Sequence, residues 1–436
     1  MTFKDFSEKT LKFCNETNKK QKQLLGQYPT PYTILNKLFD KIEQKNFENI
    51  LETSHGTGQI LDSVIQKGIK YKKCLAYEID EKLHNLCIKD KEYKDINFIL
   101  GDFLEQDIKE RFDFIPGNPP YFEIKDKELK KKYKKHPDFK NIIYGKINIF
   151  CLILKKSLDL LNDNGILSFI IPISFMNGRC YEKLRQYIIK NFNIINIEFI
   201  DKNLFIDTQI EVMIITIKKE KNNGKYIVRK NEILIFSLDW EEIQNKLNNY
   251  KTIKDLGGKV TTGSLVWNEN KEHLLIGEEN KIPKTGIAII YAENLINKKI
   301  ELKKINKENG KRQYIKKEIV KDKIIKEPTI LINRIIGSKN IKLNPVLTPN
   351  NFEFIAENHV NMISHTNINI LNEIYQVLQK KETLDFVRKI RGNTQLSQSD
   401  LENLIPIRHN IECKKEKNEE IIEFSLQEIL KMLKKK

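Results

Sequence analysis

Four short apolar runs near the start of the chain each end in a polar or acidic motif, and this arrangement constrains the fold more than any other feature. The runs are predicted strands separated by helices or turns, and they cover residues 47–51, 74–77, 97–100 and 112–117. Strands that alternate with helices predict a parallel α/β sheet, whose ligand sites lie at the carboxyl ends of the strands. We therefore expect the four motifs to meet at one edge of a sheet.

The first two strands end in residues suited to a ligand with a positive charge and a ribose. Glu52 ends the first strand and can pair with a cationic group. The turn after it holds Ser54, Gly56 and Gly58, and its glycines allow the backbone to approach a ligand closely. Glu78 ends the second strand twenty residues after Gly58, the spacing expected for a carboxylate that binds both ribose hydroxyls. The alternative for Glu78 is an acid that caps a helix.

The third strand ends in a motif suited to adenine. Asp102 can accept a hydrogen bond from an adenine amino group, and Ile79 and Phe103 can hold the ring between them. A phosphate is not expected in the ligand, because the chain has no G-x-G-x-x-G or G-K-[ST] run. The three motifs together imply a ligand with a cationic or zwitterionic end, a ribose and an adenine.

A proline-locked segment at residues 28–31 precedes the first strand. Thr30 is expected to cap the helix that runs through Ile34 and Leu38. A helix N-terminus with a hydroxyl and free N–H groups can hold a carboxylate, and the alternative is an ordinary cap.

The fourth strand is followed by Asn118, Pro119, Pro120 and Tyr121. The two prolines each fix φ near about −65° and thereby hold the oxygens of Asn118 and Pro119 in direction. Such a pair of oxygens can accept both hydrogens of one planar NH2 group and make its nitrogen nucleophilic, while Tyr121 offers a ring for stacking. The alternative is a proline-rich turn after a strand.

Composition indicates a multidomain globular chain with a polyanionic partner. The chain has 436 residues, with 76 basic and 59 acidic side chains and a net charge of +17, which favours nucleic acid as the partner unless the charge reflects a lysine-rich proteome. Six scattered cysteines without a C-x-x-C pair predict no zinc site and no disulfides, as expected for the cytoplasm. The longest apolar run, residues 166–176, is too short to cross a membrane.

The rest of the first half continues the α/β pattern. Residues 122–146, with a lysine-rich run at 130–135, are predicted to be a long loop. A turn is predicted at 162–165. Strands at 166–171, 194–200 and 210–217 complete seven, and Phe205 lies near the turn between the last two. A polar stretch at 218–225 marks a domain boundary, which divides the chain into 1–222 and 223–436.

These motifs resemble those of the gamma-class S-adenosylmethionine-dependent DNA adenine N6-methyltransferases of type II restriction–modification systems. The resemblance covers Gln27 to about Lys218, and less firmly the C-terminal half. It implies a seven-stranded Rossmann-like catalytic domain in residues 1–222, followed by an α+β target-recognition domain in 223–436. His55 and Asn148 depart from the family pattern, but neither belongs to the residues that would hold the amine.

The resemblance also implies a role for each motif. Tyr28 and Thr30 would lie against the methionine end of S-adenosylmethionine, and Phe205 would close the other side of the target base from Tyr121. The implied catalytic residues are Asn118, Pro119, Pro120, Tyr121 and Phe205. The implied cofactor-binding residues are Tyr28, Thr30, Glu52, Ser54, Gly56, Gly58, Glu78, Ile79, Asp102 and Phe103.

The implied activity is methylation of a flipped-out adenine in double-stranded DNA, with a cognate restriction endonuclease as functional partner and no metal. A methyltransferase of RNA adenine or of protein glutamine amides is one alternative, but the basic C-terminal half favours DNA. A non-catalytic DNA-binding specificity protein is another, which the intact motifs disfavour. The segments at 263–268, 292–294 and 393–407 resemble recognition-domain pieces.

Overall fold

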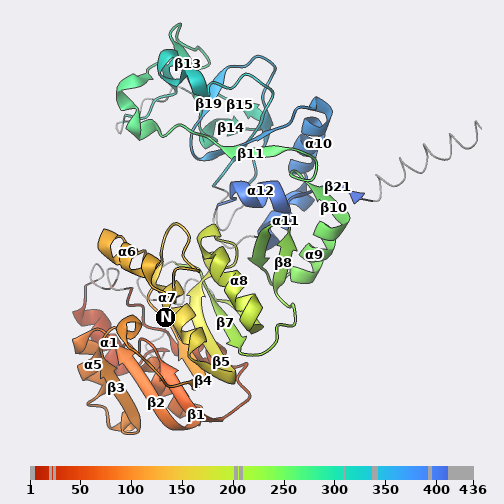
Figure 1. Cartoon of the computed structure of the whole chain (residues 1–436). Coiled ribbons are helices and arrows are strands. Elements are labelled where there is room, and N and C mark those ends of the chain that lie inside the picture. Colours follow the sequence, from red (N-terminus) through yellow and green to blue (C-terminus); the bar gives the residue numbers. More distant parts are fainter. Residues whose placement is uncertain are drawn as a thin grey trace, which may run out of the picture. The chain divides into compact units, whose positions relative to one another are not determined.

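The computed structural model describes residues 5–18, 22, 26–200, 205, 210–303, 305, 307, 310–335, 342–390 and 395–410. The chain forms two compact units (Figure 1). The N-terminal unit runs to Ile227 and includes Leu234–Leu238, and the C-terminal unit consists of Val228–Ile233 and the chain from Asp239 onward. The tail after Asn410 and residues 391–394, part of one predicted recognition segment, lie outside the described residues.

The N-terminal unit is built on a seven-stranded sheet, as predicted, and the order of its strands is β3-β2-β1-β4-β5-β7-β6. Its strands are β1 (Asn46–Glu52), β2 (Lys70–Glu78), β3 (Ile96–Leu100), β4 (Phe112–Gly117), β5 (Leu161–Pro172), β6 (Asn193–Ile200) and β7 (Val212–Lys218). Strand β7 runs antiparallel to β5 and β6, and the other pairs are parallel. The strand order reverses between β1 and β4, and this is the place where open α/β sheets bind their ligands.

Helices and a hydrophobic cluster lie on each face of this sheet. Neighbouring residues of a strand point to opposite faces, and Ile50 belongs to one cluster whereas Leu51 belongs to the other. The cluster with Ile50 packs against α3 and α4, and the cluster with Leu51 against α7 and α8. The helices of the unit are α1 (Glu8–Glu16), α3 (Tyr32–Phe39), α4 (Gln59–Gln66), α5 (Glu81–Cys87), α6 (Lys127–Lys135), α7 (Ile149–Asp159) and α8 (Glu182–Asn191).

Two sequence-based expectations for this unit were wrong. Residues 122–146 are not one long loop, because they contain α6, which starts where Asp126 Oδ1 accepts a hydrogen bond from the Leu129 amide at 2.7 Å. Lysines are good helix formers, and the apolar Leu129 and Tyr133 give this helix a face to bury. The predicted turn at 162–165 belongs instead to the long strand β5, where the register shifts against β4.

The C-terminal unit combines small sheets with short helices. One four-stranded sheet has the order β11-β20-β17-β18 and another has the order β12-β16-β13-β19. Strand β8 (Ile227–Lys230) belongs to this unit except for Ile227, and β9 (Ile233–Phe236) belongs to the N-terminal unit except for Ile233. The other strands are β10 (Tyr250–Thr252), β11 (Lys259–Thr262), β12 (Leu274–Leu275), β13 (Gly286–Ile290), β14 (Leu295–Ile296), β15 (Lys299–Ile300), β16 (Tyr314–Lys316), β17 (Ile330–Asn333), β18 (Val346–Leu347), β19 (Phe354–Ala356), β20 (Val360–Ser364) and β21 (Pro406–His409). The helices are α9 (Trp240–Asn249), α10 (Ile368–Leu378), α11 (Lys381–Ile390) and α12 (Gln398–Leu404).

Across the described ranges, no helix combines the length and apolar character needed to cross a membrane. Among the same residues, no group of three His, Cys, Asp or Glu side chains is arranged to hold a metal ion.

Candidate active site

A cavity of about 300 Å³ lies at the carboxyl ends of the first four strands. Ten of the residues singled out from the sequence line it: Tyr28, Thr30, Ser54, Gly56, Glu78, Ile79, Asp102, Phe103, Asn118 and Pro120. The others, which do not line it, are Glu52, Gly58, Pro119, Tyr121 and Phe205. The strand-end motifs therefore come together around one space, because parallel strands present their carboxyl ends at one edge.

The glycine turn, which follows β1, is hydrogen-bonded to the last two residues of β2. The His55 amide donates to the Tyr77 carbonyl at 2.9 Å, and the Gly56 amide donates to Glu78 Oε2 at 2.9 Å. Gly56 and Gly58 have φ of +55° and +85°, which favour glycine. A Cβ on Gly58 would overlap the side chain of Tyr93, so Gly58 serves close packing at the start of α4.

Glu52 is fully buried at the end of β1, and only one of its carboxylate oxygens is satisfied. Oε1 accepts a hydrogen bond from the Ser54 amide at 3.1 Å, whereas Oε2 has no partner among the described residues. Burial, followed by the nearby charge of Glu78, raises the pKa of Glu52 to about 8. The buried hydroxyls of Thr53 and Ser54 also lack partners there. Unsatisfied buried polar atoms are rare, so this group fits the zwitterionic end of a ligand.

Glu78 is fixed by backbone amides and does not cap a helix. Its Oε2 accepts from Gly56, and its Oε1 accepts from the amides of Ile79 and Asp80, all at 2.9 Å. The cap of α5 is Asp80, whose side chain accepts from the amides of Lys82 and Leu83. Burial raises the pKa of Glu78 in spite of these bonds. The carboxylate is thus held rigidly at the cavity wall, where a diol could donate to it.

The loop after β3 also lines the cavity, through Asp102 and Phe103. Asp102 Oδ1 accepts from the Leu104 amide at 2.9 Å and caps a short 3-10 helix, Phe103–Glu105. Phe103 is 3% exposed and packs edge-on against Tyr77, with ring centroids 5.6 Å apart, whereas Ile79 is 63% exposed. The two residues predicted to flank adenine thus both line the cavity. Phe103 is buried, and Ile79 is open to solvent.

Sequence reasoning missed a lysine that organises this loop. Lys156 Nζ donates to the carbonyls of Phe103 at 2.7 Å, Leu104 at 3.2 Å and Gln106 at 2.6 Å, and lies 4.9 Å from the Phe103 ring centroid. Lys156 is on α7, more than fifty residues after the loop, so no local pattern predicts the contact. Other lining residues that the sequence did not reveal are Phe13, Phe122, Leu129, Tyr133, Ile149 and Ile153.

Asn118 is fixed by two acceptors. Its Nδ2 donates to the Tyr28 carbonyl at 3.1 Å and to Thr30 Oγ1 at 2.8 Å. A carbonyl only accepts hydrogen bonds, so these contacts direct Oδ1 away from Tyr28. The expectation that Thr30 caps α3 was wrong, because Pro31 is the N-cap residue and no side chain caps the helix. The Thr30 hydroxyl instead accepts a hydrogen bond from Asn118.

Tyr121 points into the protein. Its hydroxyl contacts Asn118 Oδ1 and donates to the Ile170 carbonyl at 2.8 Å, and its ring meets Phe150 edge-on with centroids 6.2 Å apart. Burial raises the pKa of Tyr121 well above its usual value. Phe205 is 5% exposed and packs in the cluster that contains Ile50. In this structure, neither ring lines the cavity.

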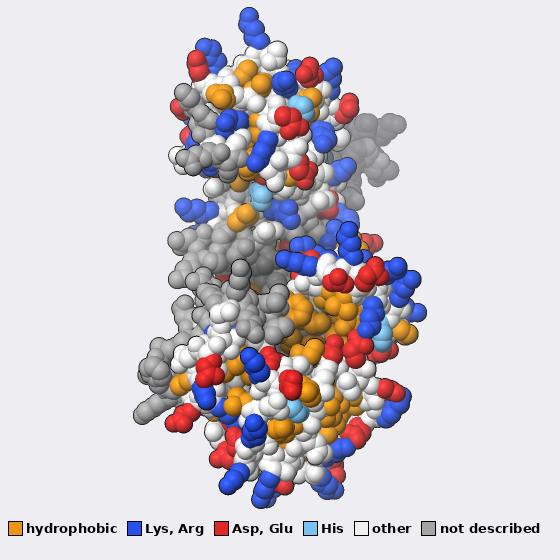
Figure 2. Space-filling view, turned by 90° about the vertical axis from the view of Figure 1, so that its left-hand side faces the viewer, with side chains coloured by type: hydrophobic (Ala, Val, Ile, Leu, Met, Phe, Trp, Pro, Cys, Tyr) orange, Lys and Arg blue, Asp and Glu red, His pale blue; other side chains and the backbone are white. Residues whose placement is uncertain are grey.

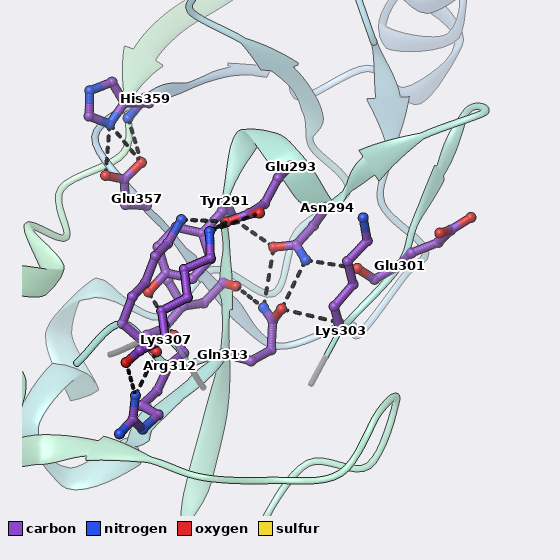
Figure 3. A network of polar contacts seen from close by, with 12 residues as sticks. Tyr291, Glu293, Asn294, Glu301, Lys303, Lys307, Arg312, Gln313, Glu357 and His359 are labelled. Carbon is purple, nitrogen blue, oxygen red and sulfur yellow. Dashed lines mark hydrogen bonds and ion pairs between the residues drawn. The ribbon is translucent and has the colours of Figure 1, made fainter. Parts of the chain in front are cut away.

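The predicted recognition segment at 292–294 is a short 3-10 helix, of which only Asn294 is buried (Figure 3). Asn294 is fully buried, accepts from the Tyr291 amide at 2.8 Å, and donates to the Glu301 carbonyl at 2.8 Å and to Gln313 Oε1 at 2.9 Å. The neighbouring Glu293 lies outside this network and pairs with Lys311 at 2.5 Å. Asn294 therefore stabilises this short helix, whereas Glu293 is exposed and forms ion pairs with Lys307 and Lys311.

The family model and several curated relatives identify restriction-modification methylases as the family of this chain. The family model described as Eco57I restriction-modification methylase matches residues 24–205. The chain is 31% identical over 277 residues to modification methylase CviBIII of Paramecium bursaria Chlorella virus NC1A, covering 62% of this chain and 68% of that protein. It is 29% identical over 262 residues to type II methyltransferase M.CvrRI of Paramecium bursaria Chlorella virus XZ-6E, covering 59% and 66%. With type II methyltransferase M.BsuBI of Bacillus subtilis, identity is 24% over 453 residues and coverage is 88% of each chain.

Proposed function

This chain belongs to the DNA methyltransferases of type II restriction–modification systems, and we propose that it is a gamma-class enzyme that methylates N6 of adenine in double-stranded DNA. Its cofactor is S-adenosylmethionine, which supplies an electrophilic methyl group on a sulfonium. We choose an amino group as the acceptor of the methyl group because the side-chain amide of Asn118 is held in a fixed direction.

The residues at the carboxyl ends of the strands have roles that match the parts of the cofactor. Ser54 at the cavity wall and Glu52, which does not itself line the cavity but has an unsatisfied Oε2, receive the ammonium and carboxylate end. Glu78 accepts hydrogen bonds from the ribose hydroxyls. Asp102 accepts a hydrogen bond from the adenine amino group, and the side chains of Ile79 and Phe103 hold the adenine ring between them. All three residues line the cavity. Gly56 keeps the turn close to the ligand.

The target amine is activated by two oxygens. Asn118 Oδ1 and the Pro119 carbonyl accept its two hydrogens, which draws the nitrogen lone pair out of conjugation and directs it at the methyl group. Among the described residues, no donor reaches the Pro119 carbonyl, so it is available as an acceptor. The amine would attack the methyl carbon in line as the bond between that carbon and the sulfonium sulfur breaks, which leaves S-adenosylhomocysteine, and the nitrogen would then lose a proton to water. Pro120 holds this geometry rigid.

The target adenine leaves the duplex to reach these oxygens, at a cost of a few kcal/mol. Tyr121 recovers part of that cost by stacking, once its hydroxyl leaves Asn118 Oδ1 and the amine takes its place. Phe205 is buried in this structure, so its side chain also has to move before it closes the other side of the base.

DNA binding rests on positive charge and on the C-terminal unit. The chain carries 17 more basic than acidic side chains, and Lys131, Lys134 and Lys135 of α6 are exposed beside the cavity wall that Leu129 and Tyr133 form. The C-terminal unit serves as the target-recognition domain, a module that a methyltransferase of protein glutamine would not need. A cognate endonuclease and a cytoplasmic location complete the proposal.

Sequencing of genomic DNA from cells that express the protein tests this function, with Asn118→Ala as the control. We expect modified adenine throughout one short motif, and its loss in the control. Modified cytosine instead of adenine would refute the N6 assignment. If a folded protein that binds the cofactor leaves DNA unmodified, methyl transfer to RNA or to a glutamine peptide becomes the next assay, and activity there would refute the choice of DNA.

A further inference from the structure

Helix α1 is attached to the glycine turn of the cofactor cavity. Thr10, which is fully buried, contacts Thr57 through their hydroxyl oxygens at 2.7 Å. Ser7 caps the helix, and its hydroxyl lies 2.8 Å from that of Thr10. Ahead of the helix, Asp5 accepts hydrogen bonds from the amide and hydroxyl of Thr33 on α3 at 3.0 and 3.1 Å.

Lys9 adds an ionic attachment one residue before Thr10. Its Nζ lies 3.3 Å from Asp62 Oδ1 and 2.9 Å from Asp90 Oδ2, contacts the Tyr93 hydroxyl, and is 4.1 Å from the centroid of the Tyr93 ring. The hydrogen bond from Lys9 is the main cause that lowers the pKa of Asp90. Two carboxylates on separate segments thus share one largely buried ammonium, which holds α1 against α4 and the chain before β3.

Phe13 follows on the same face of the helix. It lies three residues after Thr10 and four after Lys9, the spacings that place side chains side by side on a helix. Phe13 is half-buried, lines the cavity, and belongs to neither of the two hydrophobic clusters of the unit described above. The helix therefore presents an aromatic ring to the ligand space rather than to the core of the sheet.

We propose that α1 is a clamp of the cofactor site, in which Phe13 covers bound S-adenosylmethionine from the side of the glycine turn and Lys9 and Thr10 hold the helix in place. The proposal rests on the proposed function, since it takes the cavity to be the cofactor site. An apolar cover excludes water from the ligand and slows its release. Figure 2 shows a hydrophobic patch on the displayed face of the protein, bordered by both basic and acidic side chains.

Binding of S-adenosylhomocysteine to the full-length chain, measured by titration calorimetry, tests the clamp. Phe13→Ala and Lys9→Met should each raise the Kd about tenfold, and Phe13→Leu should raise it less. Lys12→Ala is the matched control, because Lys12 is on the exposed side of the same helix and its ion pair with Glu16 spans 3.9 Å. Circular dichroism and DNA affinity without cofactor should be unchanged in all four variants.

The possible results of this titration distinguish a failure of the proposed function from a failure of the clamp alone. If the wild-type chain does not bind S-adenosylhomocysteine, both the proposed function and the clamp fail. If the wild-type chain binds but Phe13→Ala stays within twofold of its Kd, the clamp alone is refuted. A Lys12→Ala variant that loses as much affinity as Phe13→Ala also refutes it, because the effect would then not depend on the cavity face.

Discussion

Replacing Thr30 by valine should slow methyl transfer about fivefold and leave cofactor affinity unchanged. Valine has nearly the shape of threonine but lacks the hydroxyl that accepts from Asn118 Nδ2 at 2.8 Å. Thr30 is otherwise well fixed, because Gln59 Nε2 donates to its carbonyl at 2.9 Å. The substitution therefore removes one contact and leaves the backbone in place.

The magnitude follows from the worth of one hydrogen bond. Asn118 keeps the Tyr28 carbonyl at 3.1 Å as its second acceptor, so its amide is loosened but not freed. A net loss of about 1 kcal/mol corresponds to roughly a fivefold fall in rate. Asn118→Ala removes the catalytic oxygen itself and should cost about a hundredfold or more.

Single-turnover transfer of a tritiated methyl group to a duplex that contains the recognition sequence measures this effect, with the Kd of S-adenosylhomocysteine measured alongside. Thr33→Val is the matched control, because Thr33 lies on α3 three residues after Thr30 but is exposed and contacts Asp5. Thr30→Ser restores the hydroxyl and should restore the rate.

Two results would contradict the reasoning. An unchanged rate for Thr30→Val would show that the hydroxyl does not orient Asn118. A weaker Kd with an unchanged rate at saturating cofactor would instead favour the role predicted from the sequence, in which Thr30 touches the methionine end of the cofactor.

Three further predictions concern the surroundings of the site. Burial raises the pKa of Glu52 to about 8 and lowers that of His55 to about 4, so between pH 6.5 and 8 unfolding releases a proton from Glu52, whereas the proton uptake by unfolded His55 is mostly over; the free energy of unfolding should fall by about 1 kcal/mol over this range in urea titrations, and Glu52→Gln should remove that fall. Lys156→Met should weaken S-adenosylhomocysteine binding about tenfold in calorimetry, because three loop carbonyls lose their donor; an unchanged Kd would contradict this. Replacing Lys131, Lys134 and Lys135 of α6 by alanine should weaken binding to specific and non-specific DNA alike and reduce the salt dependence of log K by about 2 to 3, measured by fluorescence anisotropy; the exposed Lys72 and Lys109, replaced in the same way, are the control.

Local sequence determined the sheet and the residues at its edge. Apolar runs of strand length, each followed by Glu52, Glu78, Asp102 or Asn118, were sufficient to predict a parallel sheet with these residues at its carboxyl edge. The physical reason is that strand periodicity, glycine turns and prolines act over a few residues, so their effect can be read without knowing the rest of the fold.

Only the tertiary structure decided which side chains complete the site. Thr30 binds Asn118 rather than capping its helix, Lys156 holds a loop far away in sequence, and the ring of Tyr121 turns into the core. Phe13 reaches the cavity because α1 is fastened to a turn that follows it by more than forty residues. These contacts join segments that no local pattern connects, and they form only when packing brings the segments together.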